Sequence, residues 1–339
     1  MEHELLDYML ERYDIAEFPA IADQYERWKV SRLLNGMRLL DATPAMRNTM
    51  VKYVPLLAAG AQVSVAISDE IPHDPAAVAE LPRFGISVVH PDTAAAFDVV
   101  MDCAGYCANV SSRFGYAELT RSGIYRYEGR DQPVLMVDSG QIKQIENEYG
   151  TGDGFIRAMQ QLGHGDVAGR HCVIFGGGKV GRGIARELLE REAVVSIVDG
   201  SDLAVRMESV GYIDRFDAQA VKGAIASAWC VVTATGIVGA LAEFAQDLDE
   251  SNALIANMGV DDEFGPQLPG ERALNNKEPL NFILAEPTQL RFLDPTFALS
   301  NAAALSLIKG EITPGINAPA STLEAPILAL WTTAQRSRT

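Results

Sequence analysis

The chain has 339 residues, of which 28 are basic and 45 acidic, and its formal net charge is −17. A hydrophobic fraction of 48% and a charged fraction of 22% are typical of a globular protein, and the length fits about two domains. The acidic balance argues against a nucleic-acid backbone or an anionic membrane surface as partner.

The chain shows no targeting or metal-binding pattern. It begins Met1-Glu2-His3-Glu4, without the basic and then apolar order of a secretory signal, and no apolar run reaches the ~18 residues of a membrane span. The four cysteines form no disulfide framework. Cys103 and Cys107 have no neighbouring His or Cys to complete a metal site. We therefore expect a cytoplasmic protein without a metal.

The first part of the chain alternates between predicted helices and strands. Two helices are predicted within residues 1–32, where apolar residues have helical spacing from Leu5 and Pro19 can open the second helix. A further helix is predicted over 46–59. Short strands are predicted at 63–67, 86–89, 97–101 and 133–138. This alternation indicates a mostly parallel sheet.

A second alternation follows residues 150–165, which we predict to be a linker and a helix flanked by glycines. Helices are predicted over 179–190 and 203–210. Strands are predicted at 171–175, 194–198, 230–233, 253–257 and 281–284. Cys172 and Cys230 lie inside two of these apolar strands and are expected to be buried.

The clearest local signal is a glycine-rich turn between the strand at 171–175 and the helix that follows. It reads G-x-G-x-x-G, which predicts contacts with a dinucleotide through Gly176, Gly178, Lys179, Val180 and Gly181. The first glycine permits a tight turn, the second lets the backbone approach a pyrophosphate, and the third lets helix and strand pack closely. The alternative is a structural turn that binds nothing.

Asp199 ends the next strand, 18 residues after Gly181. A carboxylate there accepts hydrogen bonds from the adenine-ribose hydroxyls and repels a 2′-phosphate. Because residues 200–202 supply no cation for such a phosphate, the pattern predicts NAD rather than NADP as the cofactor.

Five motifs in order resemble the S-adenosylhomocysteine hydrolase family. Beside the glycine turn with Asp199, they are DSGQIKQIENEYG at 138–150, VTATG at 232–236, NMG at 257–259 and PTFALSN at 295–301. The resemblance implies two domains around a tightly held NAD, in a homo-oligomer, with the end of the chain returning to the first domain. We therefore expect an α/β protein of two doubly wound domains: a Rossmann NAD-binding domain over 151–299 and an α/β substrate domain from 1–150 and 300–339.

The resemblance also implies further cofactor contacts. Positions beside the second ribose and the nicotinamide correspond to Thr233, Thr235, Gly236, Asn147, Asn257 and Asn301. An asparagine next to a helix start can instead be a plain cap.

The substrate half of the resemblance is altered. Val260 stands in place of the family's histidine after N-x-G, Ile142 stands at the motif lysine with Lys143 one place later, and Asp294 replaces the histidine before Pro295. We therefore expect no meaningful hydrolysis of S-adenosylhomocysteine.

Four residues are candidates for catalysis. Lys143 could serve as a base, with Glu146 three residues on along the same helix face; the alternative is a solvated surface lysine. Asp102 ends the strand at 97–101, where it serves either the substrate site or a turn. Asp294 could contact substrate from the opposite domain.

These features predict an NAD-dependent oxidoreductase, or an NAD-assisted lyase or epimerase. The enzyme would remove a hydride from a hydroxyl-bearing carbon of a small substrate. Two alternatives remain open: a thioether hydrolase of the parent family, and a catalytically silent NAD-binding regulator.

Overall fold

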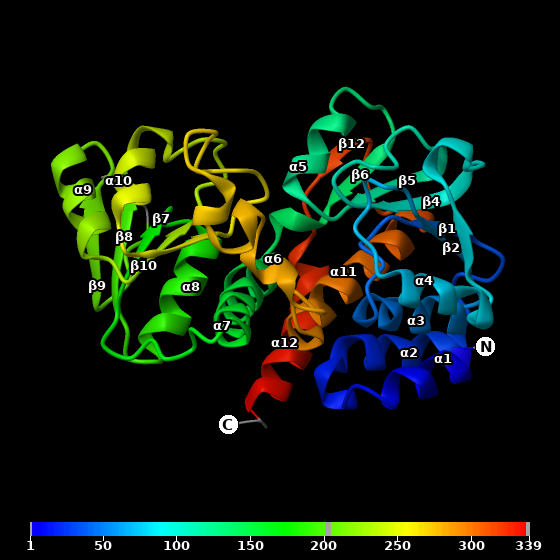
Figure 1. Ribbon diagram of the computed structural model, residues 1–339. Coiled ribbons are helices and arrows are strands. Elements are labelled where there is room, and N and C mark those ends of the chain that lie inside the picture. Colours follow the sequence, from blue (N-terminus) through cyan, green and yellow to red (C-terminus); the bar gives the residue numbers. More distant parts are fainter. Residues whose placement is uncertain (1, 201–204, 337–339) are drawn as a thin grey trace. The chain divides into compact units, whose positions relative to one another are not determined.

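The computed structural model describes residues 2–200 and 205–336 and divides into two compact units (Figure 1). The first unit consists of Met1–Ile145 and Leu290–Thr339, and the second of Glu146–Gln289. Each unit has one parallel sheet flanked by helices, which confirms the predicted α/β class with two doubly wound domains.

The division points differ from those expected from the sequence. The expected point at 150/151 lies where a π-helix over Ile145–Gly150 continues into α7 (Thr151–Gln161), and the expected point at 299/300 lies inside α11 (Leu290–Ile308). Helical turns carry the chain through both positions. Gly150 lies in the π-helix, whereas Gly165 lies in the loop that follows α7.

The sheet of the first unit has seven parallel strands in the order β12-β6-β5-β4-β1-β2-β3. The strands are β1 (Arg38–Asp41), β2 (Gln62–Ala66), β3 (Ser87–Val89), β4 (Phe97–Asp102), β5 (Ser112–Glu118), β6 (Pro133–Met136) and β12 (Gly315–Asn317). The strand order reverses between β1 and β4, so their carboxyl ends form the topological switch point of this unit. Four of the strands were predicted; β1, β5 and β12 were not.

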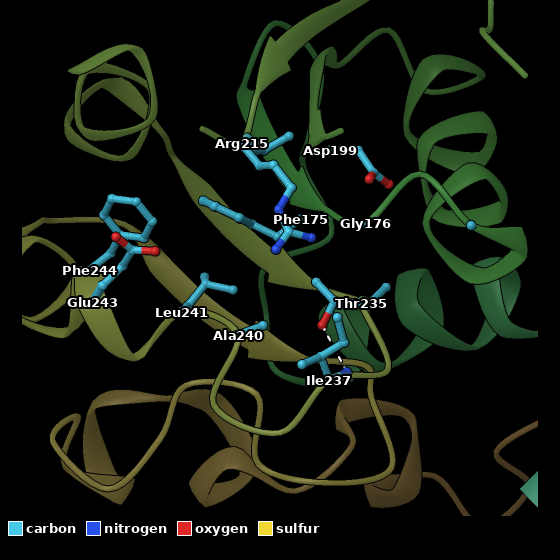
Figure 2. A pocket seen from close by; sticks show the side chains of 13 residues that line it. Phe175, Gly176, Asp199, Arg215, Thr235, Ile237, Ala240, Leu241, Glu243 and Phe244 are labelled. Atoms are coloured by element: carbon cyan, nitrogen blue, oxygen red, sulfur yellow. Dashed lines mark hydrogen bonds between the residues drawn. The ribbon is translucent and has the colours of Figure 1, made fainter. Parts of the chain in front are cut away.

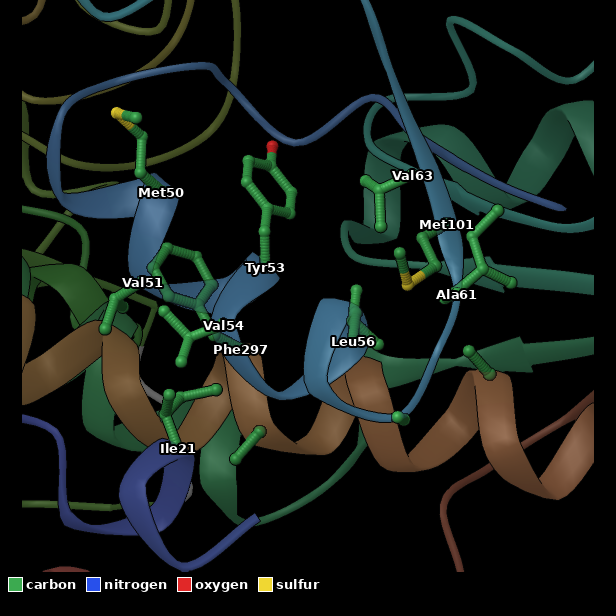
Figure 3. Packing of buried hydrophobic residues seen from close by; sticks show 14 of the residues in the cluster. Ile21, Met50, Val51, Tyr53, Val54, Leu56, Ala61, Val63, Met101 and Phe297 are labelled. Atoms are coloured by element: carbon green, nitrogen blue, oxygen red, sulfur yellow. The ribbon is translucent and has the colours of Figure 1, made fainter. Parts of the chain in front are cut away.

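Helices cover this sheet and form one large core with it. They are α1 (Glu2–Leu10), α2 (Pro19–Ser31), α3 (Tyr53–Ala58), α4 (Pro75–Glu80), α5 (Arg121–Ile124), α6 (Ile142–Gln144), α11 and α12 (Ser321–Arg336). The two predicted N-terminal helices are confirmed, and α2 begins at Pro19. Figure 3 shows part of the core, where Ile21 of α2 and Val54 of α3 pack near Phe297 of α11.

The second unit has five parallel strands in the order β11-β10-β7-β8-β9. The strands are β7 (His171–Phe175), β8 (Val194–Asp199), β9 (Val210–Asp214), β10 (Cys230–Thr233) and β11 (Leu254–Asn257). The helices are α7, α8 (Lys179–Leu189), α9 (Ala218–Ser227) and α10 (Ala245–Glu250). Cys172 and Cys230 are adjacent on β7 and β10 and are buried, as predicted.

Two predicted elements of the second unit are wrong. Residues 203 and 204 of the expected helix lie outside the described residues, 205–209 are not helical, and Val210 begins β9. The strand expected at 281–284 is a 3-10 helix over Leu280–Ile283. Apolar runs this short have no usable periodicity, so the surrounding contacts decide their conformation.

Among the described helices, none combines the length and the apolar character that crossing a membrane requires.

Candidate functional site

The three motif glycines occupy positions that differ in the space around them. A Cβ on Gly176, whose φ is +102°, would lie 2.4 Å from the carbonyl oxygen of Ala234, and one on Gly181 would lie 1.9 Å from that of Gly176. A Cβ on Gly178, by contrast, would meet no described atom within 4 Å. Gly178 is also the N-cap of α8. The turn is therefore tight at two glycines and open at the helix N-terminus, as a bound pyrophosphate requires.

This turn opens into a pocket of about 330 Å³ at the carboxyl ends of β7, β8 and β10 (Figure 2). Side chains of Ile237, Leu241 and Phe244 give it an apolar wall, and Asp199, Arg215 and Thr235 give it a polar one. An apolar cavity with a few polar groups beside a glycine turn suits an adenosine group.

Asp199 is half-buried at the end of β8 and is held against the glycine turn. Its Oδ2 accepts a hydrogen bond from the Gly177 N–H at 2.5 Å, and its Oδ1 accepts one from the Gly200 N–H at 2.6 Å. Because a carboxylate has about four acceptor positions, Asp199 can still accept hydrogen bonds from ribose hydroxyls. The geometry therefore fits the predicted role.

Lys179 and Val180 form the first turn of α8, and both are half-buried. Their backbone N–H groups belong to the helix N-terminus, where orphan donors and the helix dipole favour an anion. Their predicted contact with a pyrophosphate thus needs only the backbone.

Thr235 and Gly236 follow β10 and are fixed by Glu263, a residue that no sequence pattern identified. The Glu263 carboxylate accepts hydrogen bonds from the Thr235 N–H and hydroxyl, both at 2.8 Å, and from the Gly236 N–H at 2.7 Å. Glu263 is buried, although it follows Asp261 and Asp262 in what looks like a solvated acidic run. Thr235 lines the pocket, so Glu263 positions one of its walls.

Thr233 and Asn257 match the resembled motifs but are joined to each other. The Thr233 hydroxyl and the Gly259 N–H both donate to Asn257 Oδ1 at 2.9 Å. The two amide hydrogens of Asn257 go to the carbonyls of Asp261 and Lys277. Since both side chains are fully buried, this geometry favours a structural role at the ends of β10 and β11 over a direct cofactor contact.

Asn301 lies in the core of the first unit. Its Nδ2 donates to the Lys52 carbonyl at 2.9 Å and to Gln24 Oε1 at 3.3 Å. Its side-chain oxygen is buried and has no hydrogen-bond partner among the described residues. The amide hydrogens of Asn301 are therefore committed within this unit.

Asp102 supports the loop that follows β4. Its carboxylate accepts hydrogen bonds from the N–H groups of Cys103 and Cys107 and, at 2.5 Å, from the Tyr127 hydroxyl. Burial, together with the nearby Glu118 charge, raises the pKa of Asp102 to about 7. Asp102 is only 1% exposed, so its geometry favours the turn role.

Asp294 caps a helix that is distant in sequence. Its two carboxylate oxygens accept hydrogen bonds from the N–H groups of Ala20 and Ile21 at 3.0 and 2.9 Å. The N-cap residue of α2 is Phe18, whose side chain cannot supply this hydrogen bond. Burial raises the pKa of Asp294 to about 7. This carboxylate is thus a cap supplied from α11.

Lys143 and Glu146 differ from expectation in their local geometry. Lys143 is 4% exposed, so the alternative of a solvated surface lysine is wrong. Glu146 lies in the π-helix over Ile145–Gly150, as does the half-buried Asn147. The wider turn of a π-helix means that a spacing of three residues does not by itself put Lys143 and Glu146 on one face.

The π-helix lies against α8. A Cβ on Gly183 would be 1.8 Å from the Glu148 carbonyl oxygen, and the Glu148 carboxylate pairs with both Arg182 and Arg186. This close approach links the segment around Glu146 to the helix of the glycine turn.

A further buried network, which no sequence pattern predicts, lies at the end of β1. Lys52 Nζ lies 2.5 Å from Asp41 Oδ1 and 2.7 Å from Thr43 Oγ1, and the Tyr53 hydroxyl donates to Asp41 Oδ2 at 2.8 Å. The side chains of Lys52 and Asp41 are fully buried. Burial also raises the pKa of Tyr53 well above its ordinary value. This network closes the carboxyl end of β1.

Known proteins match the chain in three ways. A family model described as "Putative NAD(P)-binding" matches residues 165–264. The adenosylhomocysteinase of Sulfolobus acidocaldarius is 27% identical over 273 residues, which are 71% of this chain and 64% of that protein. That of Thermotoga maritima is 30% identical over 162 residues, 46% of this chain and 39% of that protein. The chain thus spans less than two thirds of the length of these curated relatives.

A solved structure of similar fold is that of a dipicolinate synthase subunit from Bacillus halodurans. It is 12% identical, covers 81% of this chain and 99% of its own, and has a TM-score of 0.53. At this identity the likeness concerns the fold alone. The glycine turn, the pocket and the family model confirm the predicted NAD cofactor at the level of a dinucleotide-binding fold, and the chain resembles adenosylhomocysteinases as its motifs predicted.

Proposed function

We propose that the protein is an NAD-dependent enzyme that acts on a hydroxyl-bearing carbon of a small substrate, as an oxidoreductase or as a lyase or epimerase. The observation that carries this proposal is the open space at Gly178 beside a pocket whose rim holds Asp199. The sequence similarity to adenosylhomocysteinases supports it.

The residues of the second unit fit the cofactor. The N-terminus of α8 would hold the pyrophosphate, Asp199 would bind the adenine-ribose hydroxyls, and Thr235 would form part of the adjoining wall. NAD, when bound, supplies a reversible hydride acceptor.

The proton of the substrate hydroxyl needs a separate acceptor, and we propose Lys143. Of the four candidates, Asp102 and Asp294 accept hydrogen bonds from backbone N–H groups, which leaves Lys143 and Glu146. Lys143 stands one place after the lysine position of the resembled motif. Glu146 is its proposed partner. A buried amine beside the bound substrate would bind the hydroxyl group and hold its proton.

The structural hydrogen bonds of Asp102 and Asp294 favour a second candidate function, an NAD-binding regulator that catalyses no reaction. Two of the four predicted catalytic side chains support the fold, and Val260 is 87% exposed where the resembled family has a histidine. This regulator would bind NAD but convert no substrate.

A turnover experiment separates these functions. The purified chain is examined by absorbance and mass spectrometry for co-purifying NAD, and is then supplied with NAD and a panel of nucleosides and small polyols. A dehydrogenase produces NADH in proportion to substrate, and a lyase or epimerase changes the substrate without net NADH. Binding of NAD with no change in any compound supports the regulator. Release of homocysteine from S-adenosylhomocysteine near 1 s⁻¹, an ordinary rate for enzymes, would contradict the expectation of no hydrolysis.

Lys143→Met tests the proposed base. We expect it to abolish substrate conversion and leave the affinity for NAD within a few-fold of the wild type, because the lysine contributes to proton transfer and not to cofactor binding. Lys309→Met, which changes an exposed lysine of the same unit, is the control and keeps full activity. Full activity in Lys143→Met would exclude this lysine as the base.

A further inference from the structure

Arg215 lines the pocket although neither the motifs nor the resemblance points to it. It follows directly after β9, whose last residue, Asp214, is the register partner of Asp199 on β8. The Arg215 N–H donates to the Asp199 carbonyl at 3.0 Å. This backbone contact fixes the two residues side by side at the edge of the pocket.

Figure 2 shows the side chain of Arg215 extending toward Phe175, and Asp199 lines the same pocket on the side of the glycine turn. Arg215 is the only basic residue among the described residues that line the pocket, which also include the acidic Asp199 and Glu243. Its guanidinium carbon lies 5.0 Å from the centre of the Phe216 ring, which is 76% exposed. The guanidinium group is therefore at the mouth of the pocket and not in the core.

A guanidinium group at this place has a defined chemistry. It binds phosphate oxygens through two parallel N–H groups, and its flat face can stack on an aromatic base. Residues 200–202, directly after Asp199, supply no cation for a 2′-phosphate. The cation that the structure supplies comes from the neighbouring strand instead, 16 residues after Asp199.

We propose that Asp199 and Arg215 form a selectivity pair, in which the Asp199 carboxylate alone excludes a 2′-phosphate that Arg215 could otherwise bind. The inference rests on the proposed dinucleotide site and deepens it. A 2′-phosphate carries about two negative charges at neutral pH, so it is repelled by the carboxylate and attracted by the guanidinium. Neutralising the carboxylate leaves the attraction and converts the pocket to one that accepts NADP.

Asp199→Asn is the variant that isolates this effect. The asparagine keeps one side-chain oxygen to accept the Gly177 or Gly200 N–H, so part of the support of the glycine turn remains. Arg215→Gln removes the cation from an exposed position and is expected to leave folding unchanged. Arg206→Gln, at another exposed arginine of the second unit that does not line the pocket, is the matched control.

The experiment is calorimetric titration of NAD, NADP and adenosine 2′,5′-bisphosphate into the wild type, the two single variants, the double variant and the control. We expect the wild type to bind NAD at least about tenfold more tightly than NADP, and Asp199→Asn to shift this ratio toward NADP by about tenfold or more. We expect the double variant to lose the increase in affinity for NADP and for the bisphosphate that Asp199→Asn shows. The control behaves as the wild type.

Three results would overturn the pair. One is an increase in NADP affinity that persists in the double variant. Another is an Asp199→Asn variant that folds and keeps the wild-type ratio of NAD to NADP affinity. If Asp199→Asn does not fold, Arg215→Gln decides alone: it should weaken the residual binding of NADP and the bisphosphate more than that of NAD, and an equal effect excludes the pair. Absence of all dinucleotide binding by the folded wild type instead contradicts the proposed function itself.

Discussion

Asp199 and Asp102 each end a parallel strand, one in each unit, but their carboxylates have different surroundings. Asp199 is half-buried and lines a pocket of about 330 Å³ next to an open glycine turn. Asp102 is 1% exposed and accepts hydrogen bonds from two N–H groups and a tyrosine hydroxyl. The same residue type at the same kind of position thus faces a ligand site in one unit and supports a loop in the other.

The glycine turn beside Asp199 and the loop after Asp102 account for the difference. After β7 the chain turns at Gly176 and leaves the N-terminus of α8 open. After β4 the chain folds back at Ala104 and Gly105, which have positive φ angles, and their N–H groups donate to the buried Glu118 carboxylate. An acid at the carboxyl end of a strand is available for function only where the neighbouring loop leaves space for a ligand.

The strongest test of the supporting role in the first unit is Lys52→Met. Removal of the amine leaves the Asp41 carboxylate buried without its ion-pair partner, and we expect a loss of about 3–5 kcal/mol in the free energy of unfolding. Urea unfolding followed by tryptophan fluorescence reports on it, because Trp28 and Trp331 belong to this unit.

The control for that experiment is Lys309→Met, which breaks an exposed pair with Glu311. Exposed pairs contribute about 0–1 kcal/mol, so this variant should unfold almost as the wild type does. Equal stability of the two variants would mean that the network around Asp41 is not a support of the fold.

In the second unit, Glu263→Gln tests whether the pocket wall depends on one buried carboxylate. The glutamine amide cannot accept the hydrogen bonds that one oxygen of Glu263 accepts from Thr235 or Gly236. We expect a loss of about 1–3 kcal/mol in unfolding free energy and weaker binding of NAD. Glu271→Gln, at an exposed acid of this unit, should change neither quantity.

Asp294→Asn is expected to change how the stability depends on pH. Burial raises the pKa of Asp294 to about 7, so the folded chain keeps a proton that the unfolded chain releases near pH 4. The contribution of that proton to the free energy of unfolding is fully present below about pH 4, and it is lost as the pH rises through 7. Relative to the variant, the wild type should lose about 1 kcal/mol per pH unit over this range.

Thermal unfolding of both proteins between pH 4 and pH 8 measures the difference. Asparagine resembles the protonated carboxyl, so the variant lacks this part of the pH dependence. Asp131→Asn, which changes an exposed acid, should follow the wild type at every pH. Parallel curves for the wild type and Asp294→Asn would show that Asp294 is ionised in the folded protein.

The glycine turn could be predicted from the sequence because its parts are close together in the chain. β7, the three glycines, α8 and Asp199 lie within about 30 residues and form one βαβ unit, whose spacing is set by local geometry. The buried carboxylates that support the fold could not be predicted in this way, because their partners are far away in the chain. Asp294 caps a helix 274 residues away, and Glu263 reaches across 28 residues to Thr235.

A motif match also did not reveal what its residues contact. Thr233 and Asn257 stand in two resembled motifs, yet the Thr233 hydroxyl donates to Asn257 Oδ1, and the Asn257 amide hydrogens go to backbone carbonyls. The isolated run at 281–284 was wrongly predicted as a strand because three apolar residues in a row carry no periodicity. Contacts with residues distant in sequence determine the conformation and the hydrogen bonds at such positions. The sequence alone does not identify these contacts.

The central claim, that the second unit holds an open dinucleotide site, is tested most directly by titrating NAD into the wild type and Gly178→Ala. Gly178 has a φ of −70° that alanine tolerates, and its Cβ meets no described atom within 4 Å, so the variant should fold normally. The methyl group would stand where the pyrophosphate approaches α8, and we predict at least about a tenfold loss of NAD affinity. Gly223→Ala, an equally open position on α9, should bind NAD as the wild type does. Equal affinity of Gly178→Ala and the wild type, or no binding of NAD by the wild type, would contradict the claim.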